Sequence, residues 1–340
     1  MPKASYFVGI DISSEYFTAT TIKDPQDPIL TGVDFSNELS GFENFADLLS
    51  ENAIPKDEVA ICMETTGVYS EKICYYLYNN GYNVYSEQPN KVKKAFNANR
   101  HKTDSVDSEQ IAEYIYRFED KAQQWQPRED ILVKIKTLLN SRELLVKYKT
   151  GISNHLHAIK RKEVKTEIAI DSLEEVRQNI QDNIDRMEDK MDELVKQKEE
   201  IKRIFYILRS APGYKTFLPL RLIVKTNGFK MNVDHKNLAS NIGISPLKNQ
   251  SGKSKYKKDK SRGNGNAALR KLLRLAARSV VTHKERFRKY YLRKLNEGKP
   301  ETLVLNNVAN KLLKITFAMV RDNQEYIPNH QSVNPALKNC

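Results

Sequence analysis

Residues 5–36 read SYFVGIDISSEYFTATTIKDPQDPILTGVDFS, and this stretch decides the fold class of the N-terminal part of the chain. It contains three runs with the composition of β-strands. Residues 5–13 are apolar and β-branched up to Asp11, residues 17–24 alternate in polarity, and residues 28–36 follow a proline-bounded turn. Three such runs joined by short connections predict a β-meander.

Helices and strands are expected to alternate after this meander. Ser40-Gly41-Phe42-Glu43 has the pattern of a capping box, which predicts a helix start. Residues 59–65 (VAICMET) predict a buried strand that ends at Glu64, and residues 68–81 predict a helix that Gly81 terminates. A further strand at 82–89 and a helix from about Asp104 complete the order βββαβαβα. This order matches an α/β, ribonuclease H-like fold, in which helices flank a mixed central sheet.

Residues 128–208 have a different pattern, which predicts two long helices. In the second half, apolar residues recur at steps of three and four between charged flanks, as in a heptad seam. Ser172-Leu173-Glu174-Glu175 again has the pattern of a capping box at its start. Two readings of this coiled-coil segment stay open: two helices that fold back on each other, or a helical hairpin that joins subunits. The seam residues are Leu173, Val176, Ile180, Ile184, Met187, Met191, Leu194, Ile201, Phe205 and Leu208.

The C-terminal part is expected to be mainly helical. Residues 210–214 predict a turn between helices, Gly243 closes a helix, and residues 247–266 form a loop rich in Gly, Lys and Ser. A basic helix at 267–295 and a last helix at 301–322 follow. The expected domains are therefore residues 1–125, 126–208 and 209–325, with a disordered tail at 326–340.

Positive charge is concentrated in one segment of the chain. The whole sequence of 340 residues carries a net charge of +13, whereas residues 248–299 alone contain 18 basic and 3 acidic residues. An asymmetry of this size usually marks a surface for a polyanion, although general solubility is the alternative.

The cysteines and the hydropathy point to an ordinary reduced compartment. Three cysteines are too few for a disulfide framework, and none has a zinc-ligand spacing. We find no signal peptide and no apolar run long enough to span a membrane, so we expect a cytoplasmic, soluble protein.

Four carboxylates are the strongest candidates for chemistry. Asp11 and Glu64 end neighbouring predicted strands, and Asp104 and Asp107 share one face of a helix start. Taken singly, each is more often a turn former or a helix cap. Four carboxylates that converge need a cation between them, and Mg²⁺ (with Mn²⁺ as an alternative) suits hard oxygen donors and phosphate chemistry.

These residues resemble the DEDD insertion-sequence transposases related to Piv-type DNA invertases, a family also described as bridge-RNA-guided recombinases. VGIDIS, METTG and KTDSVD carry the resemblance in the first 120 residues. The resemblance implies a RuvC-like catalytic domain in which Asp11, Glu64, Asp104 and Asp107 bind the metal.

The resemblance continues to about residue 322. It implies a coiled-coil spacer, a helix–hairpin–helix-like turn at Ala211-Pro212-Gly213 and a G-x-x-P…S-G segment. The family's nucleophilic serine then corresponds to Ser251. Two departures are Lys215, where hairpin motifs usually have a second glycine, and Lys260-Ser261, where the family often has threonine-lysine. Residues expected to contact DNA or RNA are Lys253, Lys255, Lys257, Lys258, Lys260, Arg262, Arg270, Arg274 and Arg278.

The expected function is therefore a DNA transposase or recombinase. The resemblance implies a covalent phosphoserine intermediate, a structured guide RNA and a dimer or tetramer formed through the coiled coil. Tyr256 is a rival hydroxyl in the Ser251 loop. Two alternatives remain: a metal-dependent nuclease of the junction-resolvase type without serine chemistry, and a non-enzymatic nucleic-acid scaffold.

Overall fold

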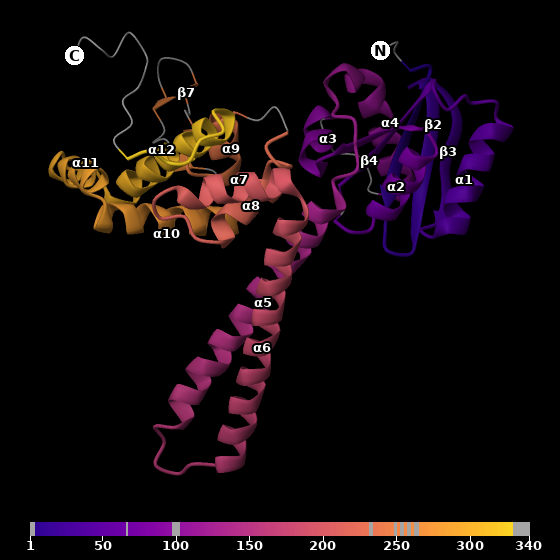
Figure 1. Cartoon of the computed structure of the whole chain (residues 1–340). Helices are drawn as coiled ribbons and strands as arrows, with labels where there is room; N and C mark the ends of the chain where they lie inside the picture. Colours follow the sequence, from indigo (N-terminus) through magenta and orange to yellow (C-terminus); the bar gives the residue numbers. More distant parts are fainter. Residues whose placement is uncertain are drawn as a thin grey trace, which may run out of the picture. The chain divides into compact units, whose positions relative to one another are not determined.

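The computed structural model describes residues 4–65, 67–96, 103–230, 234–245 and 265–328, and the backbone alone of residues 246–247, 250–251, 255–256 and 260–261. The chain divides into two compact units, Met1–Pro127 and Arg128–Cys340 (Figure 1). Each unit has a hydrophobic core of its own residues.

A mixed five-stranded sheet forms the centre of the first unit, with the strand order β3-β2-β1-β4-β5. The antiparallel meander consists of β1 (Tyr6–Ile12), β2 (Tyr16–Asp24) and β3 (Asp27–Ser36). On the other side of β1, strands β4 (Val59–Glu64) and β5 (Asn83–Glu87) run parallel to it. The predicted meander is confirmed, and the sheet agrees with a ribonuclease H-like layout.

Helices cover both faces of this sheet. On one face, α1 (Leu39–Glu51) and α2 (Glu71–Asn79) share a core with Val8, Ile10 and Ile61. On the other face, α4 (Asp104–Phe118) packs with Ala60 and Cys62; α3 (Pro89–Ala95) precedes α4, and the 3₁₀ helix Glu119–Lys121 follows it. The predicted order βββαβαβα is found, with α3 added between β5 and α4.

Both predicted capping boxes are wrong in position. Helix α1 begins at Leu39 after the extended residue Glu38, and α6 (Glu167–Gln197) begins after the extended residue Thr166. An N-cap needs an extended backbone. Ser40 and Ser172 are instead already inside their helices, so their side chains cannot cap the start.

Two long helices, α5 (Asp130–Ile159) and α6, form an antiparallel hairpin within the second unit (Figure 1). Arg142 pairs with Glu188 at 2.6 Å, and Lys160 pairs with Glu174 near the tip. Leu132 and Leu194 at the base belong to the core of the whole unit. Within the seam of α6, Ile184 and Met191 are buried in the chain itself, whereas Val176 is 45% exposed.

The rest of the second unit is a helical layer. Its helices are α7 (Glu199–Ser210), α8 (Phe217–Lys225), α9 (His235–Ile242), α10 (Ala267–His283), α11 (Glu285–Asn296) and α12 (Glu301–Arg321). The predicted single basic helix is two helices, because Lys284 is extended (φ −121°, ψ 112°) and interrupts the backbone hydrogen bonds.

The predicted loop 247–266 contains paired backbone. Strand β6 (Pro246–Leu247) pairs with β9 (Lys260–Ser261), and β7 (Gln250–Ser251) pairs with β8 (Lys255–Tyr256). The outer pair encloses the inner one, and both give backbone N–H and C=O groups hydrogen-bond partners. The Gly, Lys and Ser composition of the segment does not predict these strands.

Among the described residues, α12 is the one helix long and apolar enough to cross a membrane by length and composition. This corrects the expectation that no such run exists. Val308, Leu312 and Leu313 of this helix are buried in the core of the second unit.

Candidate active site

A row of polar side chains crosses the sheet at the end of β1. Asp11 pairs with Thr18 of β2, and Thr18 pairs with Asp34 of β3. In the parallel pairs, Ile10 is level with Met63, so Asp11 and Glu64 follow at the same level, and Glu64 pairs with Glu87 of β5. The strand register thus brings carboxylates from four strands to the same end of the sheet, where β1 and β4 terminate. We call this end the carboxylate edge.

These carboxylates belong to the face of the sheet that α4 covers. Side chains alternate between faces along a strand. Cys62 packs in the α4 core, which places Glu64 on the same face. A Cβ on Gly9 would lie 2.1 Å from the carbonyl oxygen of Ser108 in α4, so Asp11, two residues later, also faces that side. The absence of a side chain at Gly9 allows α4 to approach β1 closely.

Asp104 and Asp107 both lie in the first turn of α4, and a side-chain hydrogen bond links Asp104 to the meander. Thr103 caps the helix by accepting a hydrogen bond from the Val106 N–H at 3.3 Å. One turn later, the buried hydroxyls of Ser108 and Thr20 lie 2.8 Å apart, which joins α4 to β2. The Tyr16 hydroxyl donates to Asp104 Oδ2 at 2.8 Å. Asp104 is thereby held at the start of β2, beside the end of β1.

Two pKa shifts report negative charge on this side of the sheet. The hydrogen bond to Asp104 raises the pKa of the Tyr16 hydroxyl, and the charges of Asp34 and Asp11 add to the effect. Burial raises the pKa of the Cys62 thiol, and the charges of Glu87 and Glu64 raise it further.

The donor set fits a hard divalent cation in its chemistry. Carboxylate oxygens on one face at one strand edge are the ligands that Mg²⁺ uses, together with waters and phosphate oxygens. Within the described ranges, no three His, Cys, Asp or Glu side chains are already gathered at a spacing that holds a metal. Asp11, Glu64, Asp104 and Asp107 stay the residues that the sequence predicts to hold such an ion, and the strand register puts Asp11 and Glu64 at one level.

Three residues of this edge were not found from the sequence: Tyr16, Asp34 and Glu87. Thr18 donates to Asp34 at 2.6 Å, and Glu87 is 2% exposed and pairs with Lys91 at 2.8 Å. Strand alternation was the usable signal, because it places Glu87 beside Glu64 once β4 and β5 are paired. Tyr16 depends on the β1–β2 register and offers no local signal.

Ser251 belongs to the second unit, on β7, where it pairs with Lys255 across the inner pair of strands. The structure describes only the backbone here. The predicted contact residues Lys253, Lys257, Lys258 and Arg262 lie outside the described residues, and Lys255 and Lys260 are described by their backbone alone. The four predicted carboxylates thus belong to the first unit and Ser251 to the second.

Two members of the predicted arginine stripe on α10 donate hydrogen bonds within the second unit. Arg270 donates to the carbonyl of Ile242 at the end of α9, at 2.9 Å, and Arg274 donates to Asn306 of α12 at 3.1 Å. Arg274 and Arg278 are both exposed, whereas Arg270 is half-buried. Leu269 and Leu273 on the opposite face of α10 are buried.

The predicted hairpin turn packs against the same helix. Gly213 has φ +79°, and a Cβ there would lie 2.8 Å from the carbonyl oxygen of Ala276. The Tyr214 hydroxyl lies 2.6 Å from that of Thr316 in α12. Packing against α10 and the positive φ therefore both require a glycine at position 213.

Comparison with known proteins shows that parts of both units match transposase families. Residues 8–160 match the DEDD transposase family of IS110, and residues 206–292 match the family described as "Transposase IS116/IS110/IS902 family". The pilin gene-inverting protein of Moraxella lacunata is 26% identical over 94% of this chain and 97% of its own length. The corresponding protein of Moraxella bovis is 25% identical over the same shares. An uncharacterised protein of insertion element IS116 from Streptomyces clavuligerus is 27% identical over 41% of this chain and 36% of its own length.

Proposed function

The chain belongs to the IS110/IS116 transposase family and is an enzyme that acts on DNA as a transposase or recombinase, and we propose a role for each candidate residue in that reaction. Asp11, Glu64, Asp104 and Asp107 bind the divalent cation, Mg²⁺ or Mn²⁺, and orient the scissile phosphate. Ser251 is the nucleophile. The observation that supports the proposal is the strand register, which puts Asp11 level with Glu64, together with the hydrogen bond that holds Asp104 at the start of β2.

In the proposed step, Ser251 Oγ forms a bond to phosphorus while the bond from phosphorus to a sugar oxygen breaks. The proton that the serine loses balances the one that the departing sugar hydroxyl gains. A cation held by the carboxylates would supply Lewis-acid stabilisation of the phosphoryl charge. The phosphoserine ester conserves the energy of the broken phosphodiester bond. A hydroxyl of a second DNA strand can therefore attack this ester, release Ser251 and join the two strands without ATP.

We further propose that the protein acts as a dimer or tetramer and that a structured RNA chooses its DNA. Leu144 (49% exposed) and Tyr148 (53% exposed) lie one turn apart on α5 and leave an apolar strip on the hairpin. A second copy of the hairpin is the occupant that would cover this strip. Ser251 would then reach the carboxylates of its own chain or those of a partner.

The test uses the full-length chain with Mg²⁺, a structured RNA from the element and element-end DNA. We expect a protease-sensitive protein–DNA adduct from the unmodified chain. Asp11→Asn and Glu64→Gln should bind DNA but form no adduct, whereas Glu71→Gln, in the first turn of α2 on the opposite face, should behave as the unmodified chain does.

The alternatives give different results in the same assay. A nuclease of the junction-resolvase type keeps cleaving as Ser251→Ala and forms no adduct. A non-enzymatic scaffold binds equally well in EDTA and breaks no strand. Strand exchange by Ser251→Ala would exclude the proposed serine step.

A further inference from the structure

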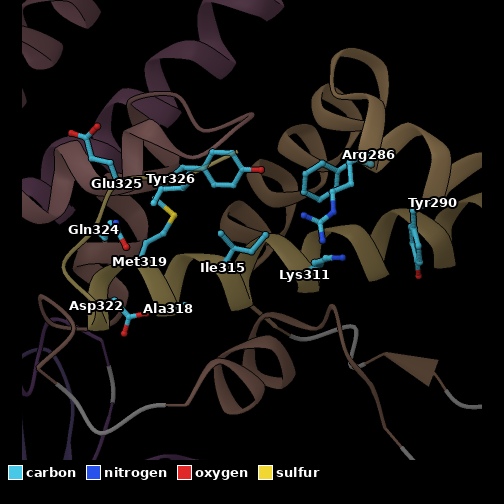
Figure 2. A pocket seen from close by; sticks show the side chains of 12 residues that line it. Arg286, Tyr290, Lys311, Ile315, Ala318, Met319, Asp322, Gln324, Glu325 and Tyr326 are labelled. Carbon is cyan, nitrogen blue, oxygen red and sulfur yellow. The ribbon is translucent and has the colours of Figure 1, made fainter. Parts of the chain in front are cut away.

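A cavity of about 220 Å³ lies in the second unit between α11, α12 and the segment that follows α12 (Figure 2). Pockets for whole small molecules usually measure about 300–1,000 Å³. This cavity is smaller, so it suits one ring system or one side chain.

Two cations line one end of the cavity. Arg286 projects from α11 and Lys311 from α12, and neither forms an ion pair with a carboxylate in the described part of the chain. Both side chains are exposed to solvent. Partial desolvation at the cavity lowers the pKa of Lys311, and the neighbouring charges of Arg286 and Lys314 lower it further. Like charges held together without a counterion favour an anionic ligand at this end.

The middle of the cavity is apolar and partly aromatic. Phe287 and Met319 are 5% and 7% exposed, and Ile315 packs against the same core. The ring of Tyr326 extends over this surface (Figure 2), and its backbone N–H donates to Ser210 Oγ at 2.8 Å, which fixes the position of the segment. A flat, planar ligand group would stack on such a surface.

The opposite end carries hydrogen-bond acceptors. Gln324 and Glu325 line it together with Asp322, whose carboxylate binds Arg321 at 2.7 Å. The cavity therefore runs from positive charge, across an apolar floor, to acceptor groups. A nucleotide has the complementary order of phosphate, ring faces and an amino-bearing base edge.

We propose that this cavity binds one unstacked nucleotide of a single-stranded segment, with its phosphate at Arg286 and Lys311 and its base against Tyr326 and Ile315. The acceptors at Gln324 and Glu325 then favour bases with an exocyclic amino group. The inference deepens the proposed function, because it names a site in the second unit for unpaired DNA or RNA.

The test compares the affinity of the full-length chain for three 12-nucleotide single strands: dC12, dT12 and an abasic strand of equal length. One base–aromatic stack should make dC12 bind about tenfold more tightly than the abasic strand. The same measurement should show dC12 binding more tightly than dT12. Arg286→Gln should weaken binding of all three strands alike, because it removes a phosphate contact.

Two further variants test the cavity in different ways, so that the result does not depend on whether any one variant folds. Ala318→Phe fills the cavity without removing a charge, and Tyr326→Ala removes the ring; both should reduce the tenfold difference severalfold. Tyr206→Ala removes an exposed tyrosine of α7 that does not line the cavity, and it should leave the difference unchanged.

An unchanged preference for dC12 over the abasic strand in folded Ala318→Phe would overturn the proposal. Loss of self-association in that variant, measured by sedimentation, with the base preference intact would assign the cavity to a protein segment instead. Neither readout needs strand exchange, so failure here is distinct from failure of the serine mechanism.

Discussion

Tyr16 and Asp104 are 88 residues apart in the chain, and their side chains form a 2.8 Å hydrogen bond at the candidate active site. The Tyr16 hydroxyl fixes the orientation of the carboxylate that it donates to, while the other carboxylate oxygen stays available. We infer that Tyr16 is a positioning residue for Asp104 rather than a catalytic one.

Tyr16→Phe should therefore weaken binding of Mn²⁺ more than it changes the folded structure. We expect the Mn²⁺ dissociation constant, measured by calorimetry, to rise about three- to tenfold, since the variant loses the hydrogen bond that orients the Asp104 carboxylate. Tyr78→Phe on α2 is the matched control. An unchanged Mn²⁺ affinity in Tyr16→Phe would remove Tyr16 from the site.

At the scale of elements, the contact between β1 and α4 positions three of the four carboxylates. A methyl group at position 9 cannot be accommodated without moving α4. Gly9→Ala should lower the free energy of unfolding by about 1–3 kcal/mol, the usual cost of overpacking, and should reduce DNA cleavage further by displacing Asp104 and Asp107.

Gly151, inside α5, is the natural comparison because a Cβ there would meet no atom within 4 Å. Gly151→Ala should raise stability by about 0.5–1 kcal/mol, since alanine loses less backbone entropy in a helix. Chemical denaturation measures both variants. The same sign of change in both would contradict the contact geometry.

Ion pairs join the base of the hairpin to the rest of the second unit. Glu129, at the start of α5, binds Lys198 and Lys230, and these hydrogen bonds hold the pKa of its carboxyl below the ordinary value of 4.5. A carboxyl whose pKa is lowered by folding stabilises the protein above its ordinary pKa and loses that contribution as the pH falls through the lower value.

Between pH 6 and pH 3, the melting temperature of the unmodified chain should consequently fall further than that of Glu129→Gln. Glu175→Gln, an exposed change on α6, should follow the unmodified chain. Parallel pH profiles for Glu129→Gln and the unmodified chain would show that the junction does not contribute.

The elements also show what the sequence can and cannot predict. Strand periodicity predicted the meander and the positions of Asp11 and Glu64, because alternation is a local property. The helix starts were misplaced because both helices begin before the predicted serines, after Glu38 and Thr166, neither of which forms a side-chain capping hydrogen bond. Tyr16, Asp34 and Glu87 were missed because their place at the edge depends on strand register, which tertiary packing sets.

At the scale of the whole molecule, the uneven charge should dominate DNA affinity. Residues 248–299 carry 18 basic and 3 acidic residues, whereas the net charge of the chain is +13. Each phosphate that the protein neutralises contributes about 0.9 to the slope of log affinity against log salt concentration.

Arg278→Gln should lower the magnitude of that slope by about 0.9, because Arg278 is exposed on α10. Arg270→Gln should instead leave the slope nearly unchanged and reduce thermal stability, since Arg270 donates to the Ile242 carbonyl. Fluorescence anisotropy at several salt concentrations separates the two effects. An equal loss of slope in both variants would place Arg270 at the DNA as well.

The central claim is that the carboxylate edge of the first unit and Ser251 of the second act in one reaction. The most direct measurement is mass spectrometry of the protein–DNA adduct after protease digestion. The account predicts a DNA phosphate on the peptide that contains Ser251, which disappears in Asp11→Asn. Attachment to Tyr256, or a Ser251 adduct that persists in Asp11→Asn, would contradict it.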